Sequence, residues 1–131
     1  MTDIEAVSTS REGFVTHSVA DEWEVTIDAA GEEGPTPNKL LVTNYASCFI
    51  PALRVSAREN GIDDLGQVRI EVAATLDEND DLSSISFDLH VEATLGEQAD
   101  AIVEYAQDIC HVQSALREGL HADVSVTDGA F

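Results

Sequence analysis

The two cysteines of the chain, Cys48 and Cys110, are its strongest candidates for chemistry. A thiolate is a nucleophile, a metal ligand and a redox group, so a pair of thiols can support disulfide exchange or metal binding. Each cysteine taken alone is more often a small buried apolar residue. Both fall on the apolar faces of segments that the sequence predicts as helices, so that alternative stays open here.

The position of each cysteine within its predicted helix affects how easily its thiol ionises. Cys48 lies eleven residues after Pro37, which is about 16 Å into the helix at 1.5 Å per residue and beyond the reach of the helix dipole. A reactive Cys48 therefore needs a cation from elsewhere in the fold. Cys110 lies near the end of its helix, where the dipole disfavours a thiolate. If one thiol attacks and the other resolves, Cys48 attacks.

Few side chains could supply that cation, because the chain has only six lysines and arginines. Arg54 and Arg58 follow Cys48 at spacings of six and ten, so neither is an i+3 or i+4 neighbour on the helix. Arg11 lies in an apparent turn before a strand, from which its side chain could reach another part of the fold. A surface ion pair is the alternative for Arg11, and the residues alone favour it.

The hydrophobic pattern around these residues predicts an α+β domain. Thr36 can cap a long helix, Pro37 suits its first position and Gly61 can end it. Alternating apolar residues on both sides of an acidic turn predict an antiparallel hairpin later in the chain. The expected elements are strands at 14–19 and 23–27, a loop at 29–37, a helix at 37–61, strands at 68–76 and 85–93, a helix at 97–110, a helical turn at 114–117 and a strand at 124–127.

Size and composition predict a single globular domain over residues 1–131, with flexible termini. Apolar residues make up 44% of the chain, which excludes a disordered protein despite the charge. The net charge of −20 excludes nucleic acids and anionic membranes as partners, since phosphate binding needs clustered basic residues. The acid is dispersed and Lys39 is the single lysine, a pattern typical of a halophile's surface. An acidic face for a cationic partner is the alternative.

The sequence carries no export or membrane signal, and a cytoplasmic protein is expected. Residues 1–5 include acid where a signal peptide would be basic. The longest apolar stretch, Ala46–Val55, contains Pro51 and Arg54 and is too short to span a bilayer. Thiols stay reduced in the cytoplasm, so paired cysteines there are more often catalytic or metal-binding than structural.

Two motifs around the cysteines resemble those of the OsmC/Ohr family, which comprises osmotically inducible protein C and organic hydroperoxide resistance proteins. Residues 34–49, Gly-Pro-Thr-Pro-Asn-Lys-Leu-Leu-Val-Thr-Asn-Tyr-Ala-Ser-Cys-Phe, resemble the family's proline-rich helix entry and peroxidatic cysteine. Residues 109–116, Ile-Cys-His-Val-Gln-Ser-Ala-Leu, resemble its resolving-cysteine motif, which is usually Cys-Pro-x-Ser. The order of elements agrees over about residues 11–127. The resemblance implies an OsmC-like fold, with antiparallel sheets around two central helices in an intertwined homodimer.

The resemblance also implies a mechanism that needs no cofactor. Cys48 would attack an organic hydroperoxide and become a sulfenic acid, and Cys110 would close a disulfide onto it. Arg11 matches the family arginine that stabilises the thiolate and orients the peroxide. A dithiol, of the lipoyl type or thioredoxin-like, would reduce the disulfide.

The chain departs from the family pattern at two positions. Asn38 stands where peroxidase members usually carry a glutamate that partners the arginine, and an amide supplies a hydrogen bond but no charge. His111 stands where proline is common and is expected only to relax the helix end. A metal site built from Cys48, Cys110 and His111 is not expected, because the ligand spacing of structural zinc sites is missing.

Four apolar side chains could form a substrate pocket around the thiol, although ordinary core packing is the simpler explanation for most of them. They are Phe14, Leu41, Tyr45 and Phe49. Asn38 favours the alternative function, a non-catalytic OsmC-like protein that binds a small ligand or senses redox state. The remaining histidines, His17, His90 and His121, are scattered and are expected at the surface.

The acidic composition predicts that the protein is stable only in concentrated salt, where counterions screen the repulsion between carboxylates. Thermal melts in molar and in dilute potassium chloride measure this directly. The melting temperature should fall on dilution of the salt. A melting temperature that does not change would mean that the acid has another purpose.

Overall fold

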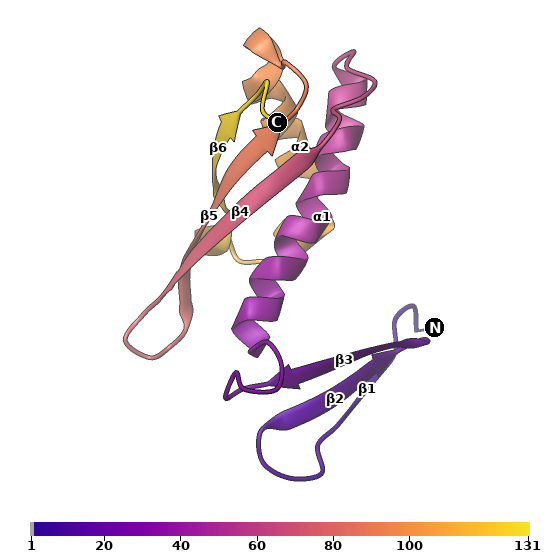
Figure 1. The fold of residues 1–131 in the computed structure, drawn as a ribbon, viewed down its shortest axis with the longest axis vertical. Helices are drawn as coiled ribbons and strands as arrows, with labels where there is room; N and C mark the ends of the chain where they lie inside the picture. The colour runs from indigo at the N-terminus through magenta and orange to yellow at the C-terminus, as the bar shows by residue number, and fades with distance from the viewer. Residues whose placement is uncertain (1) are drawn as a thin grey trace. The chain divides into compact units, whose positions relative to one another are not determined.

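The structure, a computed structural model, describes residues 2–131 and has the α+β architecture that the sequence predicts. The chain divides into two compact units, one ending at Leu41 and the other spanning Val42–Phe131. Each unit contains a three-stranded sheet (Figure 1). The single domain expected over residues 1–131 stays a prediction.

The N-terminal unit is an antiparallel sheet in the order β1-β2-β3, formed by Ala6–Thr9, Val15–Ala20 and Trp23–Asp28. The sequence predicted β2 and β3 but missed β1, because four residues are too few to show alternation. The following loop is organised by Asp28, whose carboxylate accepts hydrogen bonds from the backbone N–H groups of Ala30, Glu32 and Glu33. These bonds, with that from Glu33 the largest contribution, lower the pKa of Asp28.

Helix α1 spans Pro37–Glu59, and its ends are those expected from the sequence. The Thr36 hydroxyl accepts the N–H of Lys39, which satisfies one of the unpaired donors of the first turn. Gly61 has a φ of +86°, and the N–H groups of Gly61 and Ile62 bond to the carbonyls of Arg58 and Ala57. This pairing is a Schellman motif, which favours glycine at the left-handed position.

The second sheet has the order β4-β5-β6, formed by Val68–Leu76, Leu82–Val91 and Asp123–Thr127. β4 and β5 form the expected antiparallel hairpin, although β5 begins three residues before the predicted strand at 85–93. β6 pairs with β5 in parallel, so this sheet is mixed and not purely antiparallel as the resemblance implied. Alternate residues of β5 are buried, which gives the sheet one core face and one outer face.

Residues 97–110, predicted as one helix, form a 3-10 turn and a helix, and the helical turn predicted at 114–117 begins three residues earlier, at His111. A 3-10 turn at Gly96–Gln98 leads into α2, Ala99–Ile109, and α3 follows at His111–Ala115. Cys110 lies between α2 and α3 with an extended ψ of 113°, so the chain changes direction at this thiol. A second 3-10 turn at Glu118–Leu120 leads to β6.

The core of the second unit lies where α1 meets the inner face of the sheet. The Phe87 ring of β5 contacts the rings of Tyr45 and Phe49 on α1, with centroid distances of 4.6 and 5.4 Å. α1 also contacts α2, because the buried Ser56 hydroxyl donates to the Ile102 carbonyl at 2.6 Å. These contacts hold the middle of α1, where Cys48 lies, in a defined place.

Among residues 2–131, α1 is the one helix that is long and apolar enough to cross a membrane by length and composition. Core helices of soluble proteins pass the same test. The buried residues of α1 include Tyr45, Phe49 and Leu53, and the rings of Tyr45 and Phe49 contact Phe87 in the core. The apolarity of α1 is therefore accounted for by packing within the protein.

Candidate functional site

The two cysteine thiols line one cavity of the second unit and lie close enough together for Cys48 to contribute to the pKa of Cys110. Cys48 comes from the middle of α1 and Cys110 from the junction of α2 and α3. Both thiols are free, Cys48 is half-buried, and Cys110 is only 1% exposed. Thiols in contact can form a disulfide with little movement of the backbone, so their redox state can change within the folded unit.

Both thiols line a cavity of about 650 Å³ that is walled mainly by apolar side chains. Pro51, Ala52 and Val55 extend the wall along α1 from Cys48, at spacings of three, four and seven residues. These spacings place them on one face of the helix, so helical periodicity around Cys48 is the sequence signal that could have identified them. The other residues lining the cavity are Tyr105, Asp108, Ile109, His111 and Ser114.

The pKa of the Cys110 thiol is raised above its ordinary value, and burial is the largest cause. The backbone N–H groups of Gln113 and Val112 donate to the thiol and lower its pKa, whereas contact with Cys48 raises it. From the sequence, Cys110 was expected only at the C-terminal end of a helix. Cys110 in fact ends α2 and also begins α3, so burial outweighs the helix ends in keeping this thiol protonated.

The Tyr45 hydroxyl links the helix of Cys48 to the segment that follows Cys110. It donates to the side-chain carbonyl oxygen of Gln113 and accepts the backbone N–H of Ala122 at 3.0 Å. The Gln113 side chain in turn donates to the Gln107 carbonyl at 3.2 Å. Tyr45 is fully buried, and burial raises its pKa, so the phenol keeps its proton and both hydrogen bonds. This network positions α3 relative to α1.

Arg11 belongs to the N-terminal unit, where it lies in the bend between β1 and β2. It is exposed, lines two shallow concavities of that unit with His17, and forms no ion pair within residues 2–131. The thiol cavity has no lysine or arginine in its described lining, and His111 is its one basic side chain. A cation for a Cys48 thiolate must therefore come from outside that lining.

The remaining candidate pocket residues do not line the thiol cavity. Tyr45 and Phe49 are fully buried in the core of the second unit. Phe14 belongs to the N-terminal unit and is 72% exposed. Asn38 and Leu41 lie in the first two turns of α1 and are half-buried.

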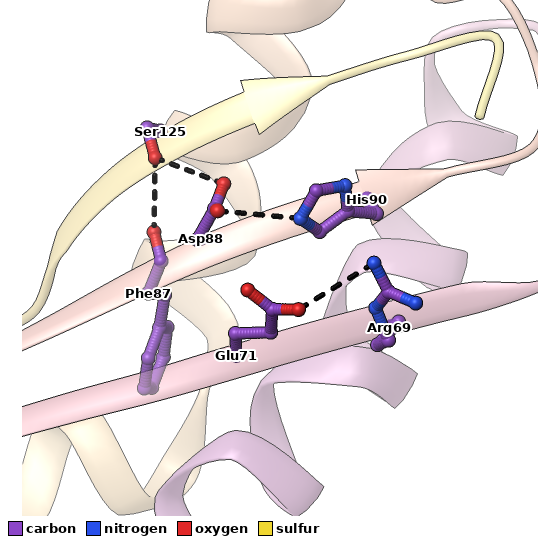
Figure 2. A network of polar contacts seen from close by, with 6 residues as sticks. All are labelled: Arg69, Glu71, Phe87, Asp88, His90 and Ser125. Carbon is purple, nitrogen blue, oxygen red and sulfur yellow. Dashed lines mark hydrogen bonds and ion pairs between the residues drawn. The ribbon is translucent and has the colours of Figure 1, made fainter.

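The expectation that every remaining histidine lies at the surface is wrong for His90. Only 18% of its side chain is exposed, and its Nε2 atom is buried. His90 lies on the outer face of the second sheet, where sequence alternation predicts exposure (Figure 2). Its burial is a tertiary effect that alternation cannot reveal.

Comparisons with known proteins agree with the fold. The family model for OsmC-like proteins matches residues 30–125. An uncharacterized protein of Haloferax volcanii is 49% identical over the full length of both chains. The organic hydroperoxide resistance protein OhrB of Bacillus subtilis is 28% identical in an alignment that covers 83% of this chain and 87% of that one. The chain therefore belongs to the OsmC-like protein family.

Solved structures show the same fold across nearly the whole chain. The crystal structure of Bacillus subtilis OhrB matches with a TM-score of 0.73 and 22% identity, and covers 96% of this chain and 98% of that one. An OsmC-like protein of Mycoplasma pneumoniae matches with a TM-score of 0.77 and 19% identity, over 96% and 95% of the two chains. The family resemblance identified from the sequence is thus confirmed.

The Tyr45 network predicts a stability loss on removal of one oxygen atom. Tyr45→Phe leaves Gln113 and the Ala122 N–H without a buried partner, which should lower the free energy of unfolding by about 1–3 kcal/mol. Tyr105→Phe is the control, because Tyr105 is 40% exposed and its hydroxyl forms no hydrogen bond within residues 2–131. Denaturant unfolding in molar salt measures both variants. Equal losses would mean that the Tyr45 bonds contribute nothing.

The buried position of Cys110 predicts a pH dependence. In the folded Cys48→Ser chain, the ultraviolet absorbance of the Cys110 thiolate should appear with a pKa above the ordinary 9.0, because burial, the largest cause, remains. The same chain unfolded in denaturant should titrate at the ordinary value. Titration of the folded chain at or below 9.0 would contradict the assignment of burial as the main cause.

Proposed function

We propose that the protein is a thiol-dependent hydroperoxide reductase that uses Cys48 and Cys110 as a redox pair. The observation that carries this proposal is the placement of both thiols, close together, in the lining of one largely apolar cavity. Membership of the OsmC-like family, which includes proteins named for organic hydroperoxide resistance, supports it. The apolar wall favours an organic hydroperoxide as substrate, because burial of its carbon chain is favourable.

In the first step the Cys48 thiolate attacks the outer peroxide oxygen. A sulfur–oxygen bond forms, the oxygen–oxygen bond breaks, and the alkoxide takes a proton and leaves as an alcohol. Cys48 becomes a sulfenic acid. The half-buried position of Cys48 at the cavity supports its assignment as the attacking thiol.

In the second step the Cys110 thiol attacks the Cys48 sulfenic acid. A disulfide forms and one water molecule leaves, so the two thiols are oxidised by two electrons while the peroxide is reduced by two. A dithiol reductant, of the lipoyl type or thioredoxin-like, then reduces the disulfide through exchange. The raised pKa of Cys110 supports its assignment as the resolving thiol, because little of this thiol is present as thiolate. A scarce thiolate competes poorly for the peroxide but can still be trapped by a sulfenic acid that lies beside it.

Arg11 is the proposed cation for the Cys48 thiolate, and a homodimer is the proposed assembly. Two observations support Arg11 as the cation. The cavity lining contains no lysine or arginine, and Arg11 forms no ion pair within residues 2–131. The homodimer is supported by four exposed apolar side chains of the N-terminal unit, which a second copy of the chain would cover. They are Phe14, Val19, Trp23 and Val25. We place the protein in the cytoplasm, where a reduced dithiol pool can regenerate it.

A non-catalytic OsmC-like protein that binds a small ligand or senses redox state is the second candidate function. Asn38 favours it, because an amide cannot supply the negative charge that a glutamate would give to an arginine. Peroxide consumption measured in molar salt with dihydrolipoamide and with a plain monothiol separates the two functions. Turnover with the dithiol supports the reductase, and loss of thiols without turnover supports the sensor.

The roles of the two cysteines are tested by exchanging each for serine. Cys48→Ser should lower the rate of peroxide consumption by more than about 1,000-fold, because the nucleophile is lost. Cys110→Ser should allow one turnover and then stop, with Cys48 held as a sulfenic acid or as a mixed disulfide. Mass spectrometry after one equivalent of cumene hydroperoxide identifies the product. A first turnover that survives in Cys48→Ser but not in Cys110→Ser would reverse the assignment.

Arg11→Ala extends the same experiment to the proposed cation. Its first turnover should slow by about tenfold or more at neutral pH, and raising the pH should restore part of the rate, because the thiolate then forms without the cation. Arg58→Ala is the matched control, since Arg58 is exposed near the end of α1 and does not line the cavity. Equal rates in the two variants would remove Arg11 from the proposed mechanism.

A further inference from the structure

Three metal-ligating side chains gather on the outer face of the second sheet, opposite the core. Glu71 of β4 and Asp88 of β5 are direct cross-strand partners, and His90 lies two residues further along β5 on the same face. Figure 2 shows the three side chains converging above the strands. Directly opposite residues on one face of an antiparallel pair have Cβ atoms about 5 Å apart, so their side chains can share a ligand.

The donor atoms of these residues already approach the geometry of a metal site. One donor atom from each residue lies within 4.8 Å of the other two. Asp88 Oδ2 is 3.3 Å from His90 Nε2. In a tetrahedral zinc site with bonds of about 2.0–2.1 Å, two ligand atoms are separated by about 3.4 Å. The Asp88 and His90 atoms therefore need almost no movement, and Glu71 needs only a rotamer adjustment.

The imidazole nitrogen in this cluster lacks a hydrogen-bond partner within residues 2–131, although it lies in ion-pair contact with Asp88. His90 Nε2 is buried and has no hydrogen bond among the residues that the structure describes. Buried polar atoms are nearly always satisfied, and each exception calls for an explanation such as a bound ion. Nε2 faces the Asp88 carboxylate, so a cation between the two would satisfy both atoms (Figure 2).

The charges around the cluster also favour a cation. Glu71 and Asp88 are like charges directly across a strand pair, an arrangement that destabilises a sheet unless it is compensated. Arg69 compensates Glu71 only loosely, with Nη2 at 3.5 Å, and its guanidinium also lies over the Phe131 ring at 5.4 Å. For Asp88 the contacts within residues 2–131 are His90 and the Ser125 hydroxyl, which donates to Oδ1 at 3.3 Å. Asp88 thus has no permanently charged partner.

We propose that Glu71, Asp88 and His90 bind a divalent transition-metal cation, in a site separate from the thiol cavity. An imidazole nitrogen with two carboxylates suits zinc, cobalt, nickel or iron, whereas magnesium and calcium prefer oxygen ligands alone. The Ser125 hydroxyl orients the Asp88 carboxylate from the neighbouring strand β6, as the outer hydrogen bonds of metal ligands do. The ion replaces Arg69 as the charge partner of Glu71.

Cobalt titration of the full-length Cys48→Ser/Cys110→Ser chain, followed by visible absorption in molar potassium chloride, tests the site without thiolate ligands. One Co²⁺ should bind per chain, and excess Zn²⁺ should displace it. His90→Gln and Asp88→Asn should each weaken binding by about tenfold or more, because each removes one ligand. Arg69→Gln should tighten binding, because it removes the competing cation, and this gain cannot come from misfolding.

His17→Gln is the matched control. His17 also lies beside a carboxylate, with Nδ1 3.9 Å from Glu24 Oε1, but within residues 2–131 it belongs to no cluster of three metal-ligating side chains. It should leave cobalt affinity unchanged. Equal losses in His17→Gln and His90→Gln would show non-specific binding to an acidic surface and would overturn the proposal. Absence of cobalt binding at millimolar concentration would overturn it too and would leave His90 as a simple ion-pair partner of Asp88.

Discussion

The hydrogen bonds of the Tyr45 hydroxyl are the constraint on which the redox site depends. The phenol is fully buried one turn before Cys48, and it bonds to Gln113 of α3 and to the backbone of Ala122 just before β6. A buried polar group costs free energy unless its hydrogen bonds are formed. The buried phenol therefore favours the packing arrangement in which both of its hydrogen-bond partners are present. That arrangement sets α3 against α1 and thereby holds Cys110 beside Cys48.

The same arrangement gives the two thiols different surroundings. Cys110 is sealed in the core and its pKa is raised by burial, whereas Cys48 remains half-buried at the cavity. Two thiols with different access to solvent can take different parts in one redox cycle, the accessible one meeting the substrate and the buried one reacting within the protein. The cavity itself supplies little charge, with Asp108 and His111 as the ionisable groups among its lining residues besides the thiols and Tyr105. The chemistry that we propose therefore depends on a cation carried by another part of the assembly.

The strong negative charge of the chain has local as well as global consequences. A net charge of −20 over 131 residues forces carboxylates into positions where they face one another. On the outer face of the second sheet, Glu71 and Asp88 meet across the strand pair, with the buried His90 nitrogen beside them. Two carboxylates in this arrangement repel each other and attract cations by the same Coulomb interaction. The acidic composition of the chain is thereby connected with the metal site that we infer.

Much of the fold could be predicted from the sequence, because its signals are local. Thr36, Pro37 and Gly61 marked the ends of α1, and alternation of apolar residues marked β4 and β5. The two cysteine motifs indicated the family, which the family model matched over residues 30–125. Helix caps, strand alternation and motif spacing depend on neighbours within a few residues, so a single sequence carries them.

Contacts between distant segments were decided only by the tertiary structure. The helix expected at 97–110 ends at Ile109, and a second helix begins directly after Cys110, where Gln113 accepts a hydrogen bond from Tyr45, sixty-eight residues earlier in the chain. Tyr45 and Phe49 lie on the helix of Cys48 but pack against Phe87, whereas other residues of α1 and α2 form the cavity wall. Only 18% of the His90 side chain is exposed, and its Nε2 atom is buried, although its strand position predicts exposure. The sequence alone determined which residues could do chemistry, and packing between segments far apart in the chain decided which of them meet.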